Sequence, residues 1–383
     1  MPDKTASDSP KPDSPQILPA AQDHHEHHVP LLRIVRRPAI EPKKALLIRA
    51  AALLAALITG ALLILLLGHD PFSVYAEMIS GAYGSKTALR ETVKIAIPLL
   101  GAALAVALSF KMRFWNIGTE GQILVGGIAA SYFALFHYQT MPPWLLITAM
   151  ALAGIIAGGL WGVIPALFKA KWGVNETLFT LMFNYIALGI QKYLQNGPWR
   201  KTGTGFPIID MFKPEARLPK LFGVHIGWVV VLLLVALVYF YINRSKQGYQ
   251  LTVVGHSVNT AKYAGMPVGR VIVRTMLISG AIAGLVGFLQ VSGADYTLTE
   301  NTAGGVGFTA ITVAWLSNLN PLIMIVFSVF IATLQKGANR IQTTFKIPAS
   351  AADVLIGIIL FFMLGCEFFI NYRLVFRRLK GGR

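Results

Sequence analysis

Four polar side chains within one apolar stretch are spaced to lie on a single face of a helix. Glu176, Thr180 and Asn184 are four residues apart, and Gln191 follows two turns later, so all four project from the same side. Polar groups inside a membrane-spanning helix are costly and face protein or water. We expect this stripe either to line a path for a solute or to hydrogen-bond a neighbouring helix, with Glu176 better suited to capping the helix start.

A second group of candidate residues lies in the glycine-rich stretch from Phe114 to Gln122, which reads FWNIGTEGQ. A site for a flat, polyhydroxylated solute would need aromatic rings to stack on and amides to bind hydroxyl groups. The alternative is an interfacial turn whose rings lie at the membrane surface and whose Glu120 caps a helix. The spacing of these residues leaves both interpretations open.

No catalytic or metal-binding set is expected. The histidines beyond the N-terminal tail lack acidic or cysteine partners at useful spacing, which argues against metal or nucleophilic chemistry. Cys366 is the single cysteine, so no disulfide forms within the chain. No Gly-Lys dipeptide is present, which excludes a phosphate-binding loop of the Walker A type. If transport consumes ATP, another polypeptide binds it.

Composition identifies the setting of these residues. The chain is 55% hydrophobic and only 13% charged, whereas about a quarter of the residues are charged in soluble domains. The net charge of +17 comes from short Lys and Arg clusters between apolar stretches, the distribution typical of membrane proteins and not of nucleic-acid-binding surfaces. The sequence therefore predicts a polytopic membrane protein with the lipid bilayer, and no nucleic acid, as a partner.

Ten apolar stretches approach the length of about 20 residues that a helix needs to cross a bilayer. They lie at residues 45–67, 93–110, 122–136, 144–168, 176–194, 226–242, 271–292, 305–317, 321–335 and 352–370. The expected fold class is all-α, with about ten transmembrane helices. The stretch at 305–317 is short and fits a tilted or broken helix.

Glycines at two of these helices suggest internal symmetry. Gly118 to Gly127 opens the third helix, and Gly304 to Gly307 opens the eighth. Glycine-broken segments at matching places in two halves are typical of an inverted repeat, here relating the second to fifth helices to the seventh to tenth. The alternative is that these glycines only let helices pack closely.

Charge predicts the orientation and the division into regions. Basic clusters before the first helix, after the last helix and near residues 111–113, 169–171 and 244–274 fall on one side, which is then cytoplasmic. Residues 1–44 should form a disordered cytoplasmic tail with a basic end next to the membrane. Residues 45–370 form the membrane domain, and residues 371–383 a basic cytoplasmic tail.

Within the N-terminal tail, His24 to His28 could bind a transition metal, although a solvated, incidental tract is the simpler interpretation, because no further ligands are spaced to define a site.

The loop from Asn243 to Arg270 contains a helix signal of its own. Ser257 is a good N-cap, residues 258–264 make about two turns, and Gly265 is a helix stop. A capped helix in a basic, acid-free membrane loop is expected to bind a soluble partner.

Three blocks of sequence point to a known family. The stretch Phe114–Gln122 resembles an F-N-I-G-x-E-G-Q signature, Gly173–Tyr185 is similar to a G-x-N-E…T-x-M-x-N-Y pattern, and residues 305–316 are similar to a third block. All three resemble the permease subunits of bacterial ABC importers of the ribose and branched-chain amino acid class, and the second block resembles its nucleoside-type members.

This resemblance implies an importer with two permease subunits, the second being the same or a homologous chain, two cytoplasmic ATPase subunits and an external solute-binding protein. ATP and Mg would be bound by the ATPases, so this chain would be no enzyme and carry no cofactor. It would lie in the bacterial inner membrane with both termini cytoplasmic. We expect it to import a nucleoside, with purine nucleosides favoured. A simple sugar such as ribose is the alternative, and an ion-coupled secondary transporter is the rival from another class.

The resemblance also assigns residues. Those expected along the substrate pathway are Trp115, Asn116, Glu120, Thr180, Asn184, Phe308 and Thr309. Those expected in the helix that couples to the ATPase are Ser257, Val258, Thr260, Ala261, Tyr263 and Gly265. The family pattern there resembles G-x-N-x-x-A-A-x-x-x-G, from which Ser257 and Thr260 depart, although serine is an equally good N-cap.

Overall fold

A computed structural model describes residues 32–36, 41–203 and 205–376, which belong to two compact units. The smaller unit joins the two ends of the chain: strand β1 (Leu32–Arg36) pairs antiparallel with β4 (Tyr372–Phe376), with Leu32 opposite Phe376. Both strands lie in stretches assigned to the tails by sequence, and neither was expected. The predicted disordered tail also includes residues 42–44, which instead begin a helix, whereas residues 1–31 and 37–40, including His24–His28, lie outside the described residues.

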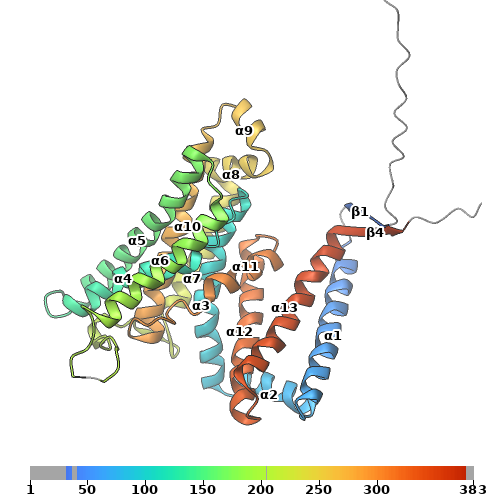
Figure 1. Ribbon diagram of the computed structural model, residues 1–383, viewed down its shortest axis with the longest axis horizontal. Helices are drawn as coiled ribbons and strands as arrows, with labels where there is room; N and C mark the ends of the chain where they lie inside the picture. The colour runs from blue at the N-terminus through green and yellow to red at the C-terminus, as the bar shows by residue number, and fades with distance from the viewer. Residues whose placement is uncertain (1–31, 37–40, 204, 377–383) are drawn as a thin grey trace, which may run out of the picture. The chain divides into compact units, whose positions relative to one another are not determined.

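The larger unit, residues 40–370, is helical (Figure 1). Its helices are α1 (Pro42–Leu66), α2 (Pro71–Tyr83), α3 (Lys86–Lys111), α4 (Thr119–Phe136), α5 (Pro143–Trp172), α6 (Glu176–Asn196), α7 (Gly227–Arg244), α8 (Lys246–His256), α9 (Val258–Tyr263), α10 (Val268–Gln290), α11 (Val306–Leu316), α12 (Pro321–Thr344) and α13 (Ala349–Asn371). A π-helical turn, η2 (Val291–Asp295), extends α10. The loop between α6 and α7 holds a 3₁₀ turn, η1 (Pro214–Ala216), and a small hairpin of β2 (Lys220–Leu221) and β3 (Val224–His225).

The all-α polytopic class is confirmed, and each of the ten predicted stretches coincides with a helix. Among the described residues, seven helices are long and apolar enough to cross a membrane, and α11 is a shorter apolar helix. The count of ten spans and the inverted repeat therefore stay predictions. Two helices were not predicted from the sequence. One is α2, which Asp70 caps by accepting a hydrogen bond from the Ser73 backbone N–H at 2.8 Å, and the other is α8, which lies in the loop expected to hold one short helix.

Helix α3 forms the centre of the larger unit. In the most apolar part of α3, 83% of the residues are buried, against 17% in α1 and 22% in α13. Its residues from Ala96 to Phe110 are buried without interruption, and it packs against α7, α10, α11 and α12. A helix apolar on every side fits this central position.

Helices α4, α5 and α10 pack backbone against backbone. A Cβ atom added to Gly126 would overlap the backbone of Gly284, and one added to Gly158 would come within 2.6 Å of the Gly284 Cα. Only glycine allows so close an approach of helices. Close helix packing therefore explains Gly126, and an inverted repeat is not needed to account for this glycine.

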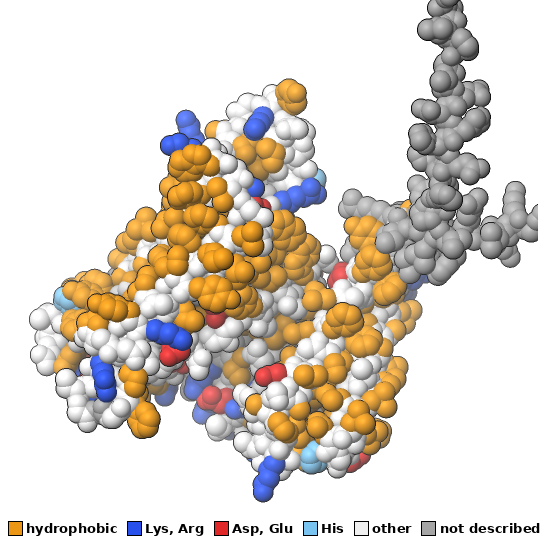
Figure 2. All heavy atoms as spheres, in the orientation of Figure 1, with side chains coloured by type: hydrophobic (Ala, Val, Ile, Leu, Met, Phe, Trp, Pro, Cys, Tyr) orange, Lys and Arg blue, Asp and Glu red, His pale blue; other side chains and the backbone are white. Residues whose placement is uncertain are grey.

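Hydrophobic side chains cover the flanks of the helices, and Lys and Arg side chains gather toward the ends of the helical unit (Figure 2). This is the surface of a protein surrounded by lipid, with its charges in the interfacial regions.

Candidate functional site

The polar stripe of α6 faces the turn that precedes α4. The Asn184 side-chain amide donates to the backbone oxygen of Ile117 at 2.9 Å, and its oxygen accepts from the backbone N–H of Gly121 at 2.9 Å. Thr180 Oγ1 accepts from the Ile117 N–H at 3.2 Å. A Cβ on Gly121 would meet the Asn184 backbone at 3.0 Å, so glycine is required there. The stripe thus holds α6 against the glycine-rich turn.

Asn116 organises that turn from within. Its side-chain oxygen accepts from the Gly118 N–H at 2.9 Å, and its amide lies 3.4 Å from the side-chain oxygens of Thr119 and Gln122. Asn116 is fully buried, so these contacts meet the requirement that a buried amide be hydrogen-bonded.

Glu120 links the start of α4 to the start of α11. One carboxylate oxygen accepts from the Gly305 N–H and the other from the Gly307 N–H, both at 2.7 Å. Gly304 and Gly305 have positive φ angles of 55° and 77°, which glycine adopts without strain. A carboxylate at a helix N-terminus pairs with the unsatisfied N–H groups and favourable dipole. Glu120 is indeed a cap, but of α11, which sequence spacing did not indicate.

The seven predicted pathway residues and the glycines that they bind form what we call the α4–α11 junction. Aromatic rings pack together at this junction. Trp115 stacks on Trp315 of α11 with ring centroids 5.7 Å apart and packs edge-on against Phe110 at 5.1 Å. Thr309 Oγ1 donates to the Gly305 carbonyl at 3.1 Å, and Phe308 is 44% exposed. Residues far apart in sequence therefore meet at this junction, and most of their polar atoms are bound within it, so their place along a solute path stays a prediction.

A polar cavity adjoins the junction through Gly304 and Val306. It has a volume of about 470 Å³ and is bounded by five helices and the π-helical turn. Its lining residues are Glu91, Lys94, Ile95 and Pro98 of α3, Gln290 of α10, Ala294 and Asp295 of η2, Gly304, Val306, Gln335, Ala338 and Asn339 near and on α11 and α12, and Asp353 and Ile356 of α13.

Some cavity side chains are paired and others are available. Lys94 binds Glu91 at 2.7 Å, and Gln290 donates to Asp295 at 3.0 Å. Within the described part of the chain, the side chains of Gln335, Asn339 and Asp353 have no hydrogen-bond partner. Their amide and carboxylate groups can therefore bind a solute. The two amides are four residues apart on α12 and share one face.

Three interruptions of regular helix surround this polar cavity. Pro98 lacks the N–H that would bind the Lys94 carbonyl. The turn at 291–295 is π-helical, a form often found at functional sites. The start of α11 is broken by the left-handed Gly304–Gly305 pair. Irregular backbone inside a membrane protein is tolerated where it lines a cavity, and broken helices mark binding sites in transporters.

The loop after α7 forms a separate feature. Ser257 Oγ accepts from the Thr260 N–H at 3.2 Å, the predicted N-cap, and Gly265 has a φ of 71° where α9 stops. Ala261 is fully buried, whereas Tyr263 is 94% exposed and Val258 44%. Helix α8 anchors this segment, because Gly255 packs against the backbone at the end of α3. The loop thus presents two large apolar side chains outward from a rigid base.

Comparison with known proteins identifies the family. Residues 88–364 match the family described as "Branched-chain amino acid transport system / permease component". The chain belongs to this permease family. It is therefore the permease component of an ABC importer, a transmembrane subunit that is not itself the enzyme.

The permease has relatives with different named solutes. It is 34% identical to the guanosine ABC transporter permease protein NupP of Bacillus subtilis, over 83% of this chain and 92% of that one. It is 32% identical to the glucose ABC transporter permease protein TsgB13 of Haloferax volcanii, over 84% and 87%. It is 26% identical to the nucleoside ABC transporter permease protein NupB of Lactococcus lactis, over 84% and 91%.

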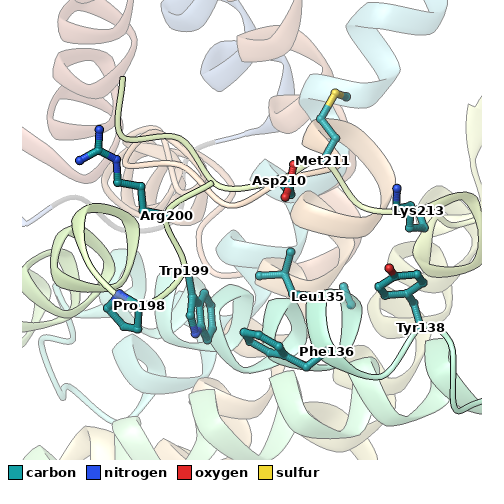
Figure 3. Close-up of a pocket in the computed structure, with 10 residues that line it drawn as sticks. Leu135, Phe136, Tyr138, Pro198, Trp199, Arg200, Asp210, Met211 and Lys213 are labelled. Carbon is teal, nitrogen blue, oxygen red and sulfur yellow. The ribbon is translucent and has the colours of Figure 1, made fainter. Parts of the chain in front are cut away.

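A second cavity of the permease lies between the end of α4 and the loop that follows α6, and has a volume of about 310 Å³ (Figure 3). Phe136 and Trp199 face one another there, with ring centroids 6.0 Å apart. Asp210, also on its wall, is bound by Lys201 at 2.7 Å. This outer cavity is made largely by one loop, whereas the polar cavity collects side chains from five helices.

Most residues of the polar cavity were not predicted as site residues from the sequence. The second predicted apolar stretch begins at residue 93 and the ninth ends at residue 335, so Glu91 and Asn339 fall outside the predicted helices. The structure extends α3 and α12 beyond those limits. The spacing of Gln335 and Asn339 was the one available signal. Glu176, expected to cap α6, instead binds Lys169 at 2.7 Å, and Asn175 is the cap.

Proposed function

We propose that the permease moves a nucleoside, with purine nucleosides favoured, into the cytoplasm through the polar cavity. The observation that carries this proposal is the set of unpaired amides and a carboxylate, Gln335, Asn339 and Asp353, gathered beside three helix interruptions. Amides bind ribose hydroxyl groups and the edges of bases. The relatives named for guanosine and nucleosides support this choice.

A simple sugar is the second candidate. The relative named for glucose is about as similar as the one named for guanosine. Among the described residues, the lining of the polar cavity contains no aromatic side chain, and a nucleobase commonly stacks on an aromatic ring, whereas hydroxyl groups need only the amides and carboxylates present here.

The partners and orientation belong to the same proposal. The positive-inside rule places α9 on the cytoplasmic side, where its exposed Tyr263 and Val258 would contact an ATPase subunit. The polar cavity lies near the start of α3 and the end of α12. The same rule then puts it in the outer half of the membrane, where a solute-binding protein would deliver the solute. The predicted pathway residue Glu120 binds the backbone of Gly305 and Gly307, on either side of the cavity residue Val306, and we propose that it positions this wall of the cavity through α11.

Uptake by cells tests the solute and the cavity together. In cells expressing the complete importer, Gln335→Ala combined with Asn339→Ala should reduce uptake of labelled guanosine about tenfold or more at equal membrane abundance. Each lost hydrogen bond is worth about 1 kcal/mol, and 1.4 kcal/mol is tenfold. Lys213→Gln in the outer cavity is the control and should transport normally. Competition by unlabelled ribose or glucose, but not by inosine, would favour the sugar. Normal guanosine uptake by the double variant would refute the role of the cavity.

A further inference from the structure

A groove with apolar walls runs between the end of α5 and the start of α10. It has a volume of about 870 Å³. Small residues line it where the helices meet, since a Cβ on Gly269 would lie 3.6 Å from the Ala170 Cβ. Leu167, Trp172 and Leu277 are 48%, 61% and 42% exposed along it. We call it the basic groove, because basic side chains also lie along it. Its walls offer an apolar surface to an apolar partner.

Three basic side chains, Lys171, Arg270 and Arg274, lie on the same groove, and none of its lining residues in the described part of the chain is acidic. Within the described residues none of the three forms a salt bridge, and the nearby Glu176 is bound by Lys169. The Lys171 ammonium lies 4.8 Å from the Trp172 ring centroid. Arg274 donates to Gln250 at 3.2 Å, but its Nε is buried without a partner. The groove thus carries positive charge with no anion of its own.

We propose that the basic groove binds a phospholipid with an anionic headgroup. An acyl chain would lie along Leu167 and Leu277, and the phosphate beside Lys171 and Arg270. The groove lies at the ends of α5 and α10 that the positive-inside rule places at the cytoplasmic surface. Basic pockets between transmembrane helices on that side bind acidic headgroups. A zwitterionic lipid would fill the apolar walls equally well but would leave the positive charge unbalanced.

The proposed site is joined to the loop that carries α9. Arg274 on the groove binds Gln250 of α8, and α8 runs directly into the Ser257 cap of α9. A bound headgroup would therefore stabilise the segment that is proposed to contact the ATPase.

Lipid titration of the full-length chain tests the proposal. Native mass spectrometry in detergent should show dioleoyl phosphatidylglycerol bound at least tenfold more tightly than dioleoyl phosphatidylcholine. Lys171→Gln with Arg270→Gln should weaken phosphatidylglycerol roughly 30-fold, from about 1 kcal/mol for each basic residue. Both side chains are exposed and make no hydrogen bond in the described structure. Arg244→Gln with Lys246→Gln removes the same charge on the same side away from the groove and should bind like the wild type.

The apolar part has its own variant. Leu277→Trp fills the groove without a change of charge and should also weaken phosphatidylglycerol. Equal affinity of the wild-type chain for the two lipids overturns the proposal, as does an equal loss in the Arg244 and Lys246 control. The proposal would also be overturned if Leu277→Trp disrupted a dimer of the chain and left the lipid affinity unchanged. That result would show that a second copy of the chain, and not a lipid, covers the groove in the wild type.

Discussion

At the scale of single residues, Asn184 and Thr180 show how the chain satisfies polar groups inside the membrane domain. Asn184 uses both its oxygen and its amide on the backbone of the turn before α4. These bonds favour helix-to-helix hydrogen bonding as the role of the stripe. Lining of the solute path by Thr180 and Asn184 stays a prediction.

His225 is a buried titratable group outside the membrane-spanning helices. Its side chain is 1% exposed, neither ring nitrogen has a hydrogen-bond partner among the residues that the structure describes, and a Cβ on Gly227 or Gly293 would overlap the ring. Burial, together with the positive charge of Lys94, lowers the pKa of His225 from 6.5 to about 4. The neutral ring is therefore the form that fits this position.

The stability of the permease should consequently fall in acid. The folded pKa lies below the unfolded value, so the unfolded chain binds the proton first, and stability is lost as the pH falls from about 6.5 toward 4, by about 3 kcal/mol in all. His225→Phe should reduce the fall in melting temperature between pH 7 and pH 4.5. His256→Gln, which changes an exposed histidine, should keep it. Identical pH profiles for the wild type and His225→Phe would contradict this account.

At the scale of elements, α9 is short but well defined at both ends. Its Ser257 cap and Gly265 stop follow from local residue types, whereas its attachment to α8 and α3 does not. Ala261 is the buried residue that fixes α9 to this base, and its N–H donates to the Ser257 carbonyl at 3.1 Å.

Breaking α9 should uncouple the permease from its ATPase. Ala261→Pro removes that N–H and costs roughly 3 kcal/mol inside a helix, so the variant should reach the membrane but fail to copurify with a co-expressed ATPase subunit. Asn259→Ala changes an exposed neighbour that is not among the predicted coupling residues, leaves the helix intact, and should copurify normally. Copurification and normal uptake by Ala261→Pro would rule out α9 as the contact.

At the scale of the whole molecule, the central α3 and the distribution of charge determine how the permease lies in the bilayer. Burial of α3 leaves the more exposed helices, such as α1 and α13, to face lipid. Clusters of Lys and Arg at the helix ends then select the direction of insertion.

Cysteine labelling should reveal that direction. In a Cys366→Ser background, Phe222→Cys and Tyr263→Cys place single thiols at sites that are 80% and 94% exposed. In intact spheroplasts a membrane-impermeant maleimide should label Phe222→Cys, and it should label Tyr263→Cys only after the membrane is permeabilised. The opposite pattern would reverse the proposed orientation and place α9 away from ATP.

The sequence by itself determined the features that depend on local composition and periodicity. Apolar stretches located the helices, because about 20 apolar residues suit a bilayer whatever their neighbours. Ser257 and Gly265 set the ends of α9. The polar stripe of α6 was singled out because polar side chains in membrane-spanning helices are costly and therefore informative, and the structure bonds it to the glycine-rich turn before α4.

Only the tertiary structure decided which of these features meet. Glu120 caps α11 across 185 residues of sequence, and β1 pairs with β4 between the two ends of the chain. The polar cavity depends on which faces of five helices turn toward one another, and its Glu91 and Asn339 lie on helix ends that resemble loop by composition. Such pairings are set by packing between distant segments, which leaves no periodic signal in either segment alone.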